Sequence, residues 1–467
     1  MAPSKQEPLF VLSEFRLAGW KSFRQASLPL RPLTLLIGAN ASGKSNLLEG
    51  IRFLSLLAKK GRNLDEVWRE THDGQIAIRG ERPEALFFRD LGELELGCEC
   101  AGLPDLREII ALQMKLRLQE QAEERLFVSA EELFNGSGQL YKLTTDASTD
   151  STLLPSKLVE KNGNGFLDQP YPRVLYPLFA RQQDPVESSD GSREWRNQAP
   201  RLSEALKRVQ FLDLSPSVMR GASFPADDRL REDGRNVSAV LFNLCKRPEN
   251  KADVLAFIRS LPEQRITDIS FPLGARRDVV LALTESFGGT ARTYDATQLS
   301  DGTLRALAIV AALLSVKPGT LLVIEEIDNG LHPSRAKHLM SEIDRLARKR
   351  SLRVLSTTHN PALVDALPLS AVPDIVLCYR DPKDGDSRLV ALEQLPDYPA
   401  LVGHQSVGQL MTSGKLEKAI HAIGEPEETR RVQASHSVSR FLAELEGGTS
   451  VAPKRPKSRR ATDKASS

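Results

Sequence analysis

The sequence predicts an α/β fold built on a mixed sheet, and three stretches carry this prediction. The apolar run Leu33–Ile37 predicts a buried strand, and the residues after Ser45 show leucine and isoleucine at helical spacing. Residues 321–324 predict a second buried strand, which ends in two glutamates. Residues 353–357 predict a third strand, with a helix expected between the two over 334–350. Buried strands that alternate with helices indicate a largely parallel sheet.

The composition is that of a globular protein with a large core. Of the 467 residues, 40% are hydrophobic and 27% are charged, which is enough for two or three domain-sized units. No apolar run approaches the roughly 20 residues that cross a bilayer. Residues 1–7 lack the apolar core of a signal peptide. We therefore expect a cytoplasmic protein without a membrane partner.

Charge and cysteine content add few constraints. The net charge is +2, but residues 451–467 carry six basic side chains against Asp463 alone. We expect this tail to be disordered, and two interpretations stay open: contact with nucleic-acid phosphates, or a solvated tail with no specific role. Cys98 and Cys100 continue an alternating strand pattern, and Cys245 and Cys378 are isolated. Neither a disulfide framework nor a zinc site is expected.

Other elements are expected along the chain. Periodicity predicts strands over 8–37 and 75–101, a helix over 106–126, a strand over 209–214, helices over 236–246 and 251–261, and a hairpin formed by 279–284 and 290–294. Glycine-rich and serine-rich stretches within residues 134–200 predict loops.

Residues 38–45 read GANASGKS and match the phosphate-binding pattern G-x-x-x-x-G-K-[ST]. Gly38 and Gly43 let the backbone turn its N–H groups toward anionic oxygens at the start of a helix. We expect Lys44 to reach the β- and γ-phosphates of a nucleotide and Ser45 to ligate Mg²⁺. The alternative is a glycine-rich turn that matches by chance. The predicted nucleotide-binding residues of this loop are Gly38, Ala39, Asn40, Ala41, Ser42, Gly43, Lys44, Ser45 and Asn46.

Two glutamates follow the predicted strand 321–324. A buried strand of a parallel sheet places them at the carboxyl edge, where ligands bind in α/β folds. Neighbouring residues of a strand point to opposite faces, so we expect different roles for the two. Glu325 would hold Mg²⁺, and Glu326 would orient or deprotonate an attacking water. A pair of surface glutamates is the alternative.

Two further segments carry polar groups toward this site. Ser300 and Gly302 open a helix expected over 304–316 and would present a hydroxyl and free N–H groups to an anion. A plain N-cap would explain them equally well. His359 follows the third predicted strand and would lie at the same edge as Glu326. No role is assigned to His332, His338, His404, His421 or His436.

The segments GANASGKSN, LSDGT, LLVIEE, DNGLHP and TTHNP follow the order and spacing of ABC-type ATPase heads. Residues 8 to about 415 resemble a RecF/SMC-like ATPase of the OLD-related prokaryotic group, including Trp20–Phe23 and Asp233–Asn236. The resemblance implies a P-loop NTPase fold and a homodimer whose heads enclose two ATP molecules. Ser300 and Gly302 of one head would contact the γ-phosphate bound at Lys44 of the other.

The resemblance gives two more residues a role and leaves three departures. Asp328 would lie in the loop that joins the two ATP sites, and His359 would be the γ-phosphate switch. The first acid of the pair is Glu325, where the family more often has aspartate. Asp301 and Thr303 stand where transporter heads carry glycine and glutamine. The glutamine that usually completes the Mg²⁺ shell is not identifiable, and its weak candidates are Gln75, Gln182 and Gln183.

The long insertion decides between members of this group. The 253 residues between Ser45 and Leu299 lack sustained heptads, so a compact head is expected instead of a long coiled coil. The expected ranges are 8–101 and 276–424 for the two parts of the head, with an antiparallel β lobe, 102–275 for a helical and loop insertion lobe, and 425–467 for the basic tail.

The expected activity is hydrolysis of ATP to ADP and phosphate, with DNA or an effector protein under its control in phage defense or DNA repair. Asp384–Asp386 superficially resembles a nuclease centre, but it lies between two predicted strands, so a hairpin turn is favoured. Any nuclease or toxin is expected in a separate partner. The rival hypothesis is an ATP-gated scaffold that sequesters an effector with little turnover, and a transporter subunit is a weaker third.

Overall fold

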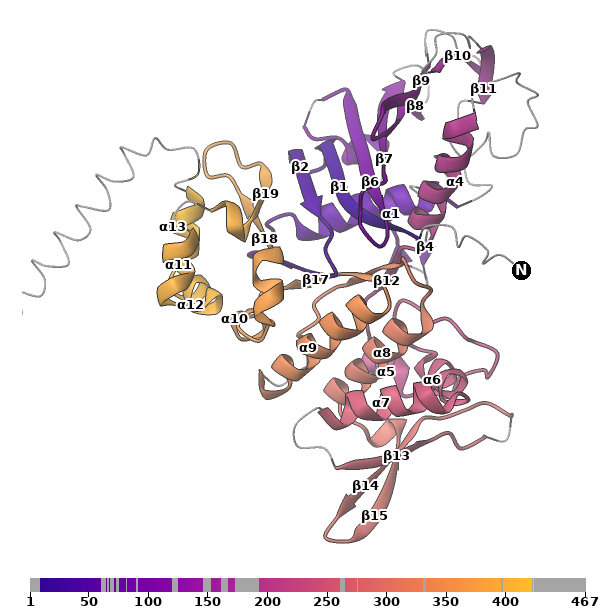
Figure 1. Ribbon diagram of the computed structural model, residues 1–467, viewed down its shortest axis with the longest axis vertical. Coiled ribbons are helices and arrows are strands. Elements are labelled where there is room, and N and C mark those ends of the chain that lie inside the picture. Colours follow the sequence, from indigo (N-terminus) through magenta and orange to yellow (C-terminus); the bar gives the residue numbers. More distant parts are fainter. Residues whose placement is uncertain are drawn as a thin grey trace, which may run out of the picture.

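The computed structural model describes residues 9–59, 64, 67, 71–72, 75–80, 82–89, 91–119, 125–145, 153–160, 167–172, 193–260, 265–274, 276–330, 333–395, 398–421 and 423. A six-stranded sheet lies at the centre, in the order β12-β16-β17-β3-β18-β19 (Figure 1). Its strands are β12 (Gln210–Leu212), β16 (Leu321–Ile324), β17 (Arg353–Thr358), β3 (Leu33–Ile37), β18 (Ile375–Arg380) and β19 (Ser387–Ala391). Every neighbouring pair is parallel except the antiparallel hairpin β18–β19. The predicted mixed sheet is confirmed.

An eight-stranded antiparallel sheet covers one side of this centre, in the order β11-β10-β9-β8-β7-β6-β1-β2. Its strands are β1 (Phe10–Trp20), β2 (Phe23–Pro29), β6 (Glu93–Gly102), β7 (Ile109–Gln119), β8 (Arg125–Asn135), β9 (Gly138–Thr145), β10 (Leu153–Glu160) and β11 (Leu167–Pro172). The expected division between residues 101 and 102 falls inside this sheet, because β6 pairs with β7. The four domain ranges stay predictions.

The helix predicted over 106–126 is wrong. Ile109–Gln119 form β7 and Arg125 begins β8; Leu112, Met114 and Leu116 are buried while their neighbours are partly or fully exposed. This period of two marks a strand with one buried face, and it outweighs the high helix propensity of the Gln, Glu and Arg residues between.

Between the loop stretches predicted within 134–200 lie elements that were not predicted: β9, β10, β11 and helix α4 (Arg193–Lys207). The glycine-rich stretch at 135–138, predicted as a loop, does form the turn between β8 and β9. The remaining glycine-rich and serine-rich stretches of this region lie outside the described residues.

Helix α1 (Lys44–Leu57) lies between the two large sheets (Figure 1). Its leucines pack with β1 and β2 on one side and with Leu36, Val323 and Leu355 of the central sheet on the other. Gly50 lets β1 approach closely, because a Cβ there would lie 3.2 Å from Cζ of Phe15. The central sheet residues one position along, such as Leu35 and Ile324, point to the opposite face.

That opposite face is covered by helices (Figure 1). They are α6 (Val237–Cys245), α7 (Pro248–Ser260), α8 (Asp301–Ser315) and α9 (Pro333–Lys349), with the short α5 (Pro216–Met219) beside them. A small sheet of β13 (Ile266–Ser270), β14 (Ala282–Phe287) and β15 (Thr290–Asp295) extends from them. The helices and the hairpin predicted for this part of the chain are confirmed.

The carboxyl-terminal part contains short helices beside β18. They are α10 (Pro361–Val364), α11 (Tyr398–His404), α12 (Val407–Thr412) and α13 (Lys415–His421). The remaining elements are β4 (Thr71–His72), β5 (Gln75–Ile76) and 3-10 turns at Pro83–Leu86, Ala296–Gln298, Leu369–Asp374 and Leu392–Gln394. None of the helices described above is both long and apolar enough to cross a membrane.

Candidate functional site

The loop at residues 38–43 connects β3 to α1 at the carboxyl edge of the central sheet. Ala41 and Gly43 have φ values of 63° and 114°, so the backbone twice adopts the left-handed conformation. A Cβ on Gly38 would collide with the carbonyl oxygen of Cys378 in β18, so this position requires glycine. The loop therefore has the strand-to-helix setting that the sequence pattern predicts, with the helix N-terminus available to an anion.

Lys44 lies folded against the loop that precedes it. Its Nζ donates hydrogen bonds to the carbonyl oxygens of Gly38 at 2.7 Å and Ala39 at 2.9 Å. Burial lowers the pKa of Lys44, and the nearby Glu326 carboxylate acts in the opposite direction. Lys44 follows β3 and Glu326 follows β16, so the parallel strands bring both groups to the same edge of the sheet.

Asn46 faces the turn between β1 and β2. Its Nδ2 donates to Oγ of Ser22 at 2.8 Å, and its carbonyl oxygen accepts from the indole Nε1 of Trp20 at 2.8 Å. These contacts attach the first turn of α1 to the antiparallel sheet. Ser22 and Asn46 also line a cavity of about 540 Å³, together with Lys21, Phe87 and Arg89. A nucleotide-binding role of Asn46 stays a prediction.

The two glutamates after β16 have different surroundings, and the different roles expected for them stay predictions. Glu325 continues the sheet, because its N–H donates to the carbonyl oxygen of Leu212 at 3.0 Å. Burial raises the pKa of the Glu325 carboxyl to about 7, with a further contribution from Asp213. Glu326 is exposed and has a left-handed backbone with φ of 45°. Its N–H donates to Oγ1 of Thr357 at 2.9 Å, and its carboxylate accepts from the amide of Asn329.

A polar pocket of about 700 Å³ links Ser45 to Glu325. Its other charged and hydroxyl-bearing lining residues are Glu49, Arg52, Arg79, Asp213, Ser215, Glu232, Asp233, Arg235 and Arg305. The hydroxyl of Ser45 and the carboxylate of Glu325 are oxygen donors of the kind that Mg²⁺ prefers. Among the described residues no group of three or more His, Cys, Asp and Glu could hold an ion by itself. A Mg²⁺ ion fits here if phosphate oxygens and water complete its shell.

An ion pair forms one wall of this pocket. The Arg52 guanidinium donates to the Glu232 carboxylate through both of its Nη atoms, one at 2.8 Å, and it lies 4.0 Å above the ring of Phe211. The pair attaches α1 to the segment between β12 and α6. Sequence reasoning missed it, because Arg52 and Glu232 are 180 residues apart and belong to no motif.

Ser300 is the N-cap of α8. Its Oγ accepts from the N–H of Thr303 at 3.3 Å and lies 2.8 Å from the Thr303 hydroxyl. Asp301 pairs with Arg220 at 2.6 Å. A Cβ on Gly330 would lie 3.6 Å from the Cβ of Asp301, so the segment packs against the loop after Glu326. Ser300 and Gly302 line none of the three cavities beside residues 38–46 that are described here.

Asp328 lies in that same loop. Its Oδ1 accepts from the hydroxyl of Thr358 at 2.6 Å, which fastens the loop to the end of β17. Arg305 of α8 is close enough that Asp213, Asp301, Glu326 and Asp328 all raise its pKa, although burial lowers it overall. The helix that begins at Ser300 thus reaches back to the acids of its own chain through Arg305.

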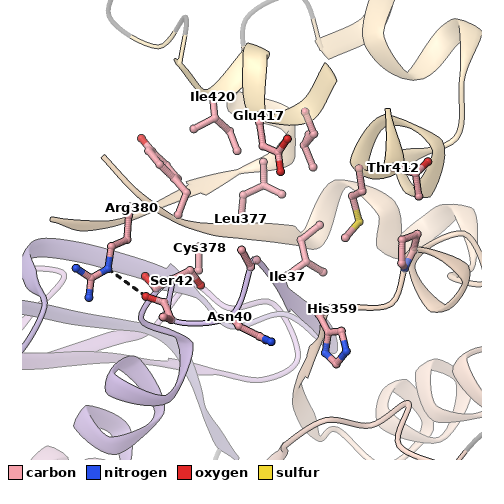
Figure 2. A pocket seen from close by; sticks show the side chains of 17 residues that line it. Ile37, Asn40, Ser42, His359, Leu377, Cys378, Arg380, Thr412, Glu417 and Ile420 are labelled. Atoms are coloured by element: carbon pink, nitrogen blue, oxygen red, sulfur yellow. Dashed lines mark hydrogen bonds between the residues drawn. The ribbon is translucent and has the colours of Figure 1, made fainter. Parts of the chain in front are cut away.

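His359 lines an apolar pocket of about 490 Å³ on the other side of the loop (Figure 2). Asn40 and Ser42 of the loop face this pocket, and Ile420 of α13 lies on its opposite side. Leu416 of α13 also lines it. Arg380 at the end of β18 donates to the carbonyl oxygen of Ala41 at 3.1 Å. The structure therefore places His359 beside the loop, as position at the strand edge predicts, and its switch role stays a prediction.

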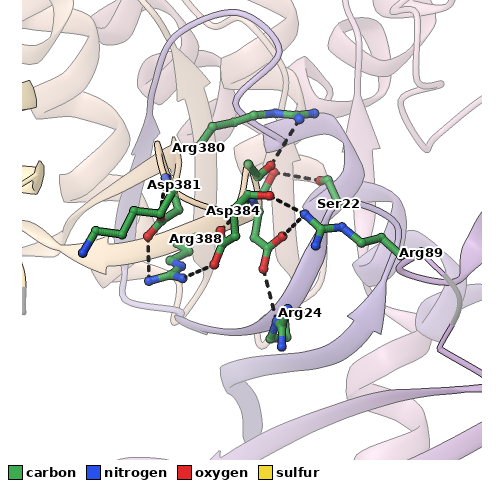
Figure 3. Close-up of polar contacts among 11 residues, drawn as sticks. Ser22, Arg24, Arg89, Arg380, Asp381, Asp384 and Arg388 are labelled. Carbon is green, nitrogen blue, oxygen red and sulfur yellow. Dashed lines mark hydrogen bonds and ion pairs between the residues drawn. The ribbon is translucent and has the colours of Figure 1, made fainter.

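Asp384 and Asp386 form ion pairs with arginines (Figure 3). Asp386 is 1% exposed and pairs with Arg89 at 2.6 Å and Arg24 at 3.2 Å. Asp384 and Asp381 both pair with Arg388, at 2.8 Å each. The segment connects β18 to β19, so the predicted hairpin turn is confirmed.

Asp213 was missed by sequence reasoning. It follows β12, which pairs in parallel with β16, so it reaches the same edge as Glu325. The available signal was the predicted strand over 209–214, which carries an acid after Phe211 and Leu212 as residues 321–325 carry one after their apolar run. Of the glutamines considered for this site, Gln182 and Gln183 lie outside the described residues, and Gln75 belongs to β5 with its side chain not described.

Comparisons with known proteins agree with this architecture. A family profile described as "AAA domain, putative AbiEii toxin, Type IV TA system" matches residues 33–86 and 160–365, which is more than half of the chain. The chain is also similar to the "DNA replication and repair protein RecF" of Brucella abortus (strain 2308) and of Brucella suis biovar 1 (strain 1330). Each is 36% identical over 97 residues, which cover 20% of this chain and 23% of the relative.

Solved structures of SMC heads are similar at lower identity. The SMC head bound to the C-winged helix domain of ScpA has a TM-score of 0.46 at 12% identity, over 82% of this chain and 99% of the other. The SMC head domain from Thermotoga maritima has a TM-score of 0.35 at 14% identity, over 82% and 98%. Since these TM-scores lie below 0.5, and the RecF match covers about a fifth of the chain, the family profile alone decides the assignment. The chain belongs to the family described as "AAA domain, putative AbiEii toxin, Type IV TA system".

Proposed function

We propose that this chain binds and hydrolyses ATP and that ATP closes a homodimer of two heads. The supporting observation is the distribution of the predicted residues within one chain. Ser45 and Glu325 share the polar pocket, and Lys44 lies within electrostatic reach of Glu326. Ser300 and Gly302 line none of the cavities described beside the loop. Two copies would be needed to bring both halves to one nucleotide.

The chemistry proposed for each residue follows from its place. Lys44 would contact the phosphates, and Ser45 and Glu325 would hold Mg²⁺, which would neutralise phosphate charge. Glu326 is exposed at the same edge, where its carboxylate can orient a water or accept its proton. In the dimer, Ser300 and Gly302 of the partner would face the γ-phosphate, Asp328 would join the two sites, and His359 would sense the phosphate.

We further propose that the dimer controls DNA or an effector protein in phage defense or DNA repair. The family description names a toxin and a toxin–antitoxin system, and the matched RecF proteins are named for replication and repair. The chain covers 23% of those relatives, so their activity is carried over here as a proposal only.

An ATP-gated scaffold is the second candidate. One surface favours it: Phe224 is 73% exposed and Leu273 is 67% exposed, and β-bridges from Ser223 and Leu273 to Val279 place the two near each other. Phe224 and Leu273 would form part of the docking surface for such an effector, since contiguous exposed apolar groups mark interaction sites. Slow turnover that is indifferent to DNA would favour the scaffold, and stimulation by DNA would favour the hydrolysing clamp.

Sedimentation of the Glu326→Gln protein tests the main proposal. Without ATP it should sediment as the wild type does, and with ATP and Mg²⁺ it should shift to a stable dimer, because the bound nucleotide is not consumed. Adding Ser300→Arg to the same chain should abolish the shift, since a long side chain would then stand at the dimer contact. A Glu326→Gln protein that binds ATP and stays a monomer would overturn the proposed dimer.

A further inference from the structure

We infer that Asp213 is a positioning residue of the proposed magnesium site, and that its carboxylate would hold water molecules of the Mg²⁺ shell. The inference rests on the proposed function, because it concerns the metal that accompanies ATP.

The sheet register brings Asp213 to Glu325. β12 is the parallel neighbour of β16, and Leu212 pairs with Ile324. The next residues are Asp213 and Glu325, and the N–H of Glu325 donates to the carbonyl oxygen of Leu212. Both acids therefore leave adjacent strands at the same level. Both also line the polar pocket that Ser45 lines.

Pairing separates these two acids from the others of the pocket. Glu49 is held by Lys21 and Arg79, Glu232 by Arg52, and Asp233 by Arg235. In the part of the chain that the structure describes, no donor forms a hydrogen bond or ion pair with the carboxylate of Asp213 or of Glu325. A carboxylate without a donor in a pocket beside a phosphate-binding loop is available to a cation or to its water.

The backbone holds Asp213 in place without using its side chain. Its N–H donates to the carbonyl oxygen of Glu232 at 2.9 Å, and Glu232 is itself fixed to α1 through Arg52. The side chain is exposed to the pocket. The backbone of Asp213 is thus held in place while its carboxylate has no donor among the described residues, which is the arrangement expected of a group that positions water.

Contact through water follows from the donor count. Mg²⁺ takes six ligands and usually keeps several waters, and the described residues offer no group of three or more acids, histidines and cysteines that could surround an ion. Ser45, Glu325 and the phosphates would hold the ion directly. A second carboxylate one strand away would then accept hydrogen bonds from the waters of its shell, as outer partners of metal sites do.

A structural role for Asp213 is the competing explanation. Asp213 is the acid with the largest effect on the pKa of Arg305, so its charge could serve only to balance that guanidinium. In that case its loss would disturb the pocket with or without a metal. The two roles differ in whether the effect depends on the divalent cation.

Titration of a non-hydrolysable ATP analogue tests the inference. The variants are Asp213→Asn, Asp213→Glu and the matched control Asp233→Asn, whose side chain lies in the same pocket but is held by Arg235. Mn²⁺ replaces Mg²⁺ and is followed by paramagnetic resonance, with nucleotide affinity measured separately in EDTA. Asp213→Asn should weaken Mn²⁺ binding to the nucleotide complex at least about tenfold and leave the affinity in EDTA unchanged. Asp213→Glu should recover part of the loss, and the control should match the wild type.

The outcomes separate the two levels of the proposal. Unchanged Mn²⁺ affinity in Asp213→Asn, with a wild type that binds nucleotide and Mn²⁺, overturns the inference alone. Equal loss with Mn²⁺ and in EDTA also overturns it, in favour of the balance with Arg305. A wild type that binds no nucleotide overturns the proposed function. If thermal unfolding shows that Asp213→Asn does not fold, Asp213→Ser removes the same carboxylate.

Discussion

Two groups of acids lie on either side of the phosphate-binding loop, and they differ in what they contact. In the β18–β19 hairpin, Asp381, Asp384 and Asp386 are all paired with arginines. At the carboxyl edge of the central sheet, Asp213 and Glu325 have no such partner among the described residues, and Glu326 contacts an amide. Acids that the fold neutralises itself stabilise the fold, whereas acids left without a cation are available to a ligand.

The largest contrast is expected in turnover. Glu326→Gln keeps the shape of the side chain but removes the charge that orients or deprotonates water, so phosphate release should fall about 10²–10⁴-fold. Asp384→Asn in the hairpin should hydrolyse ATP at the wild-type rate. Steady-state phosphate release on purified proteins measures both. Similar rates for the wild type and Glu326→Gln would show that edge acids are no more catalytic than hairpin acids.

Stability should show the reverse contrast. Asp386→Asn leaves Arg24 and Arg89 facing a neutral group at a position that is 1% exposed. A fully buried pair would lose about 3–5 kcal/mol, but both arginines are half exposed, so we expect about 2–3 kcal/mol less stability. Urea denaturation measures this, with nucleotide affinity unchanged as the control. A loss below about 0.5 kcal/mol would mean that these ion pairs do not hold the hairpin.

Glu325 should make stability depend on pH. Burial raises the pKa of its carboxyl from 4.5 to about 7, so the folded state binds this proton more tightly than the unfolded state. The loss of folding stability that comes from ionising this buried carboxyl grows as pH rises from about 4.5 to about 7 and is then constant. Glu325→Gln should therefore stabilise the protein by about 1–2 kcal/mol at pH 8 and by less at pH 5. Thermal unfolding at both values decides, and a gain that is equal at both would refute the assignment.

The smallest effect concerns Ser300, whose hydroxyl is satisfied within the chain. Ser300→Ala should lose about 1 kcal/mol, because α8 loses its N-cap. Ser300→Asp keeps a capping oxygen and should be as stable as the wild type, yet its charge should oppose a partner's phosphate and weaken ATP-dependent dimerisation. Denaturation measures the contribution of Ser300 as an N-cap to stability, and sedimentation measures its contribution to the dimer contact. Normal dimerisation of Ser300→Asp would leave Ser300 as a cap alone.

The sequence allowed the core sheet to be predicted because its strands are buried on both faces. β16 then appears as an uninterrupted apolar run and β3 as a run broken only by the buried Thr34, and the residues that follow the two strands mark the carboxyl edge. The helix predicted over 106–126 failed because polar residues with high helix propensity also suit the exposed face of an antiparallel strand.

Strand order was the part of the site that could not be predicted. Nothing in residues 209–213 says that β12 lies next to β16, so Asp213 had no reason to be grouped with Glu325. The same holds for pairs between distant segments, such as Arg52 with Glu232 and Arg89 with Asp386. These contacts arise only after the two sheets have come together around α1.

Helix α1 connects the phosphate-binding loop to both large sheets. Its residues from Leu47 to Leu57 are all buried, with the antiparallel sheet on one side and the central sheet on the other. A shift of the first turn of α1 would therefore load both sheets at once, through Asn46 to the β1–β2 turn and through Arg52 to the segment beside β12. The helix would therefore couple movements of the two sheets. Because it is buried between them, its backbone amides should be among the slowest in the chain to exchange with deuterium.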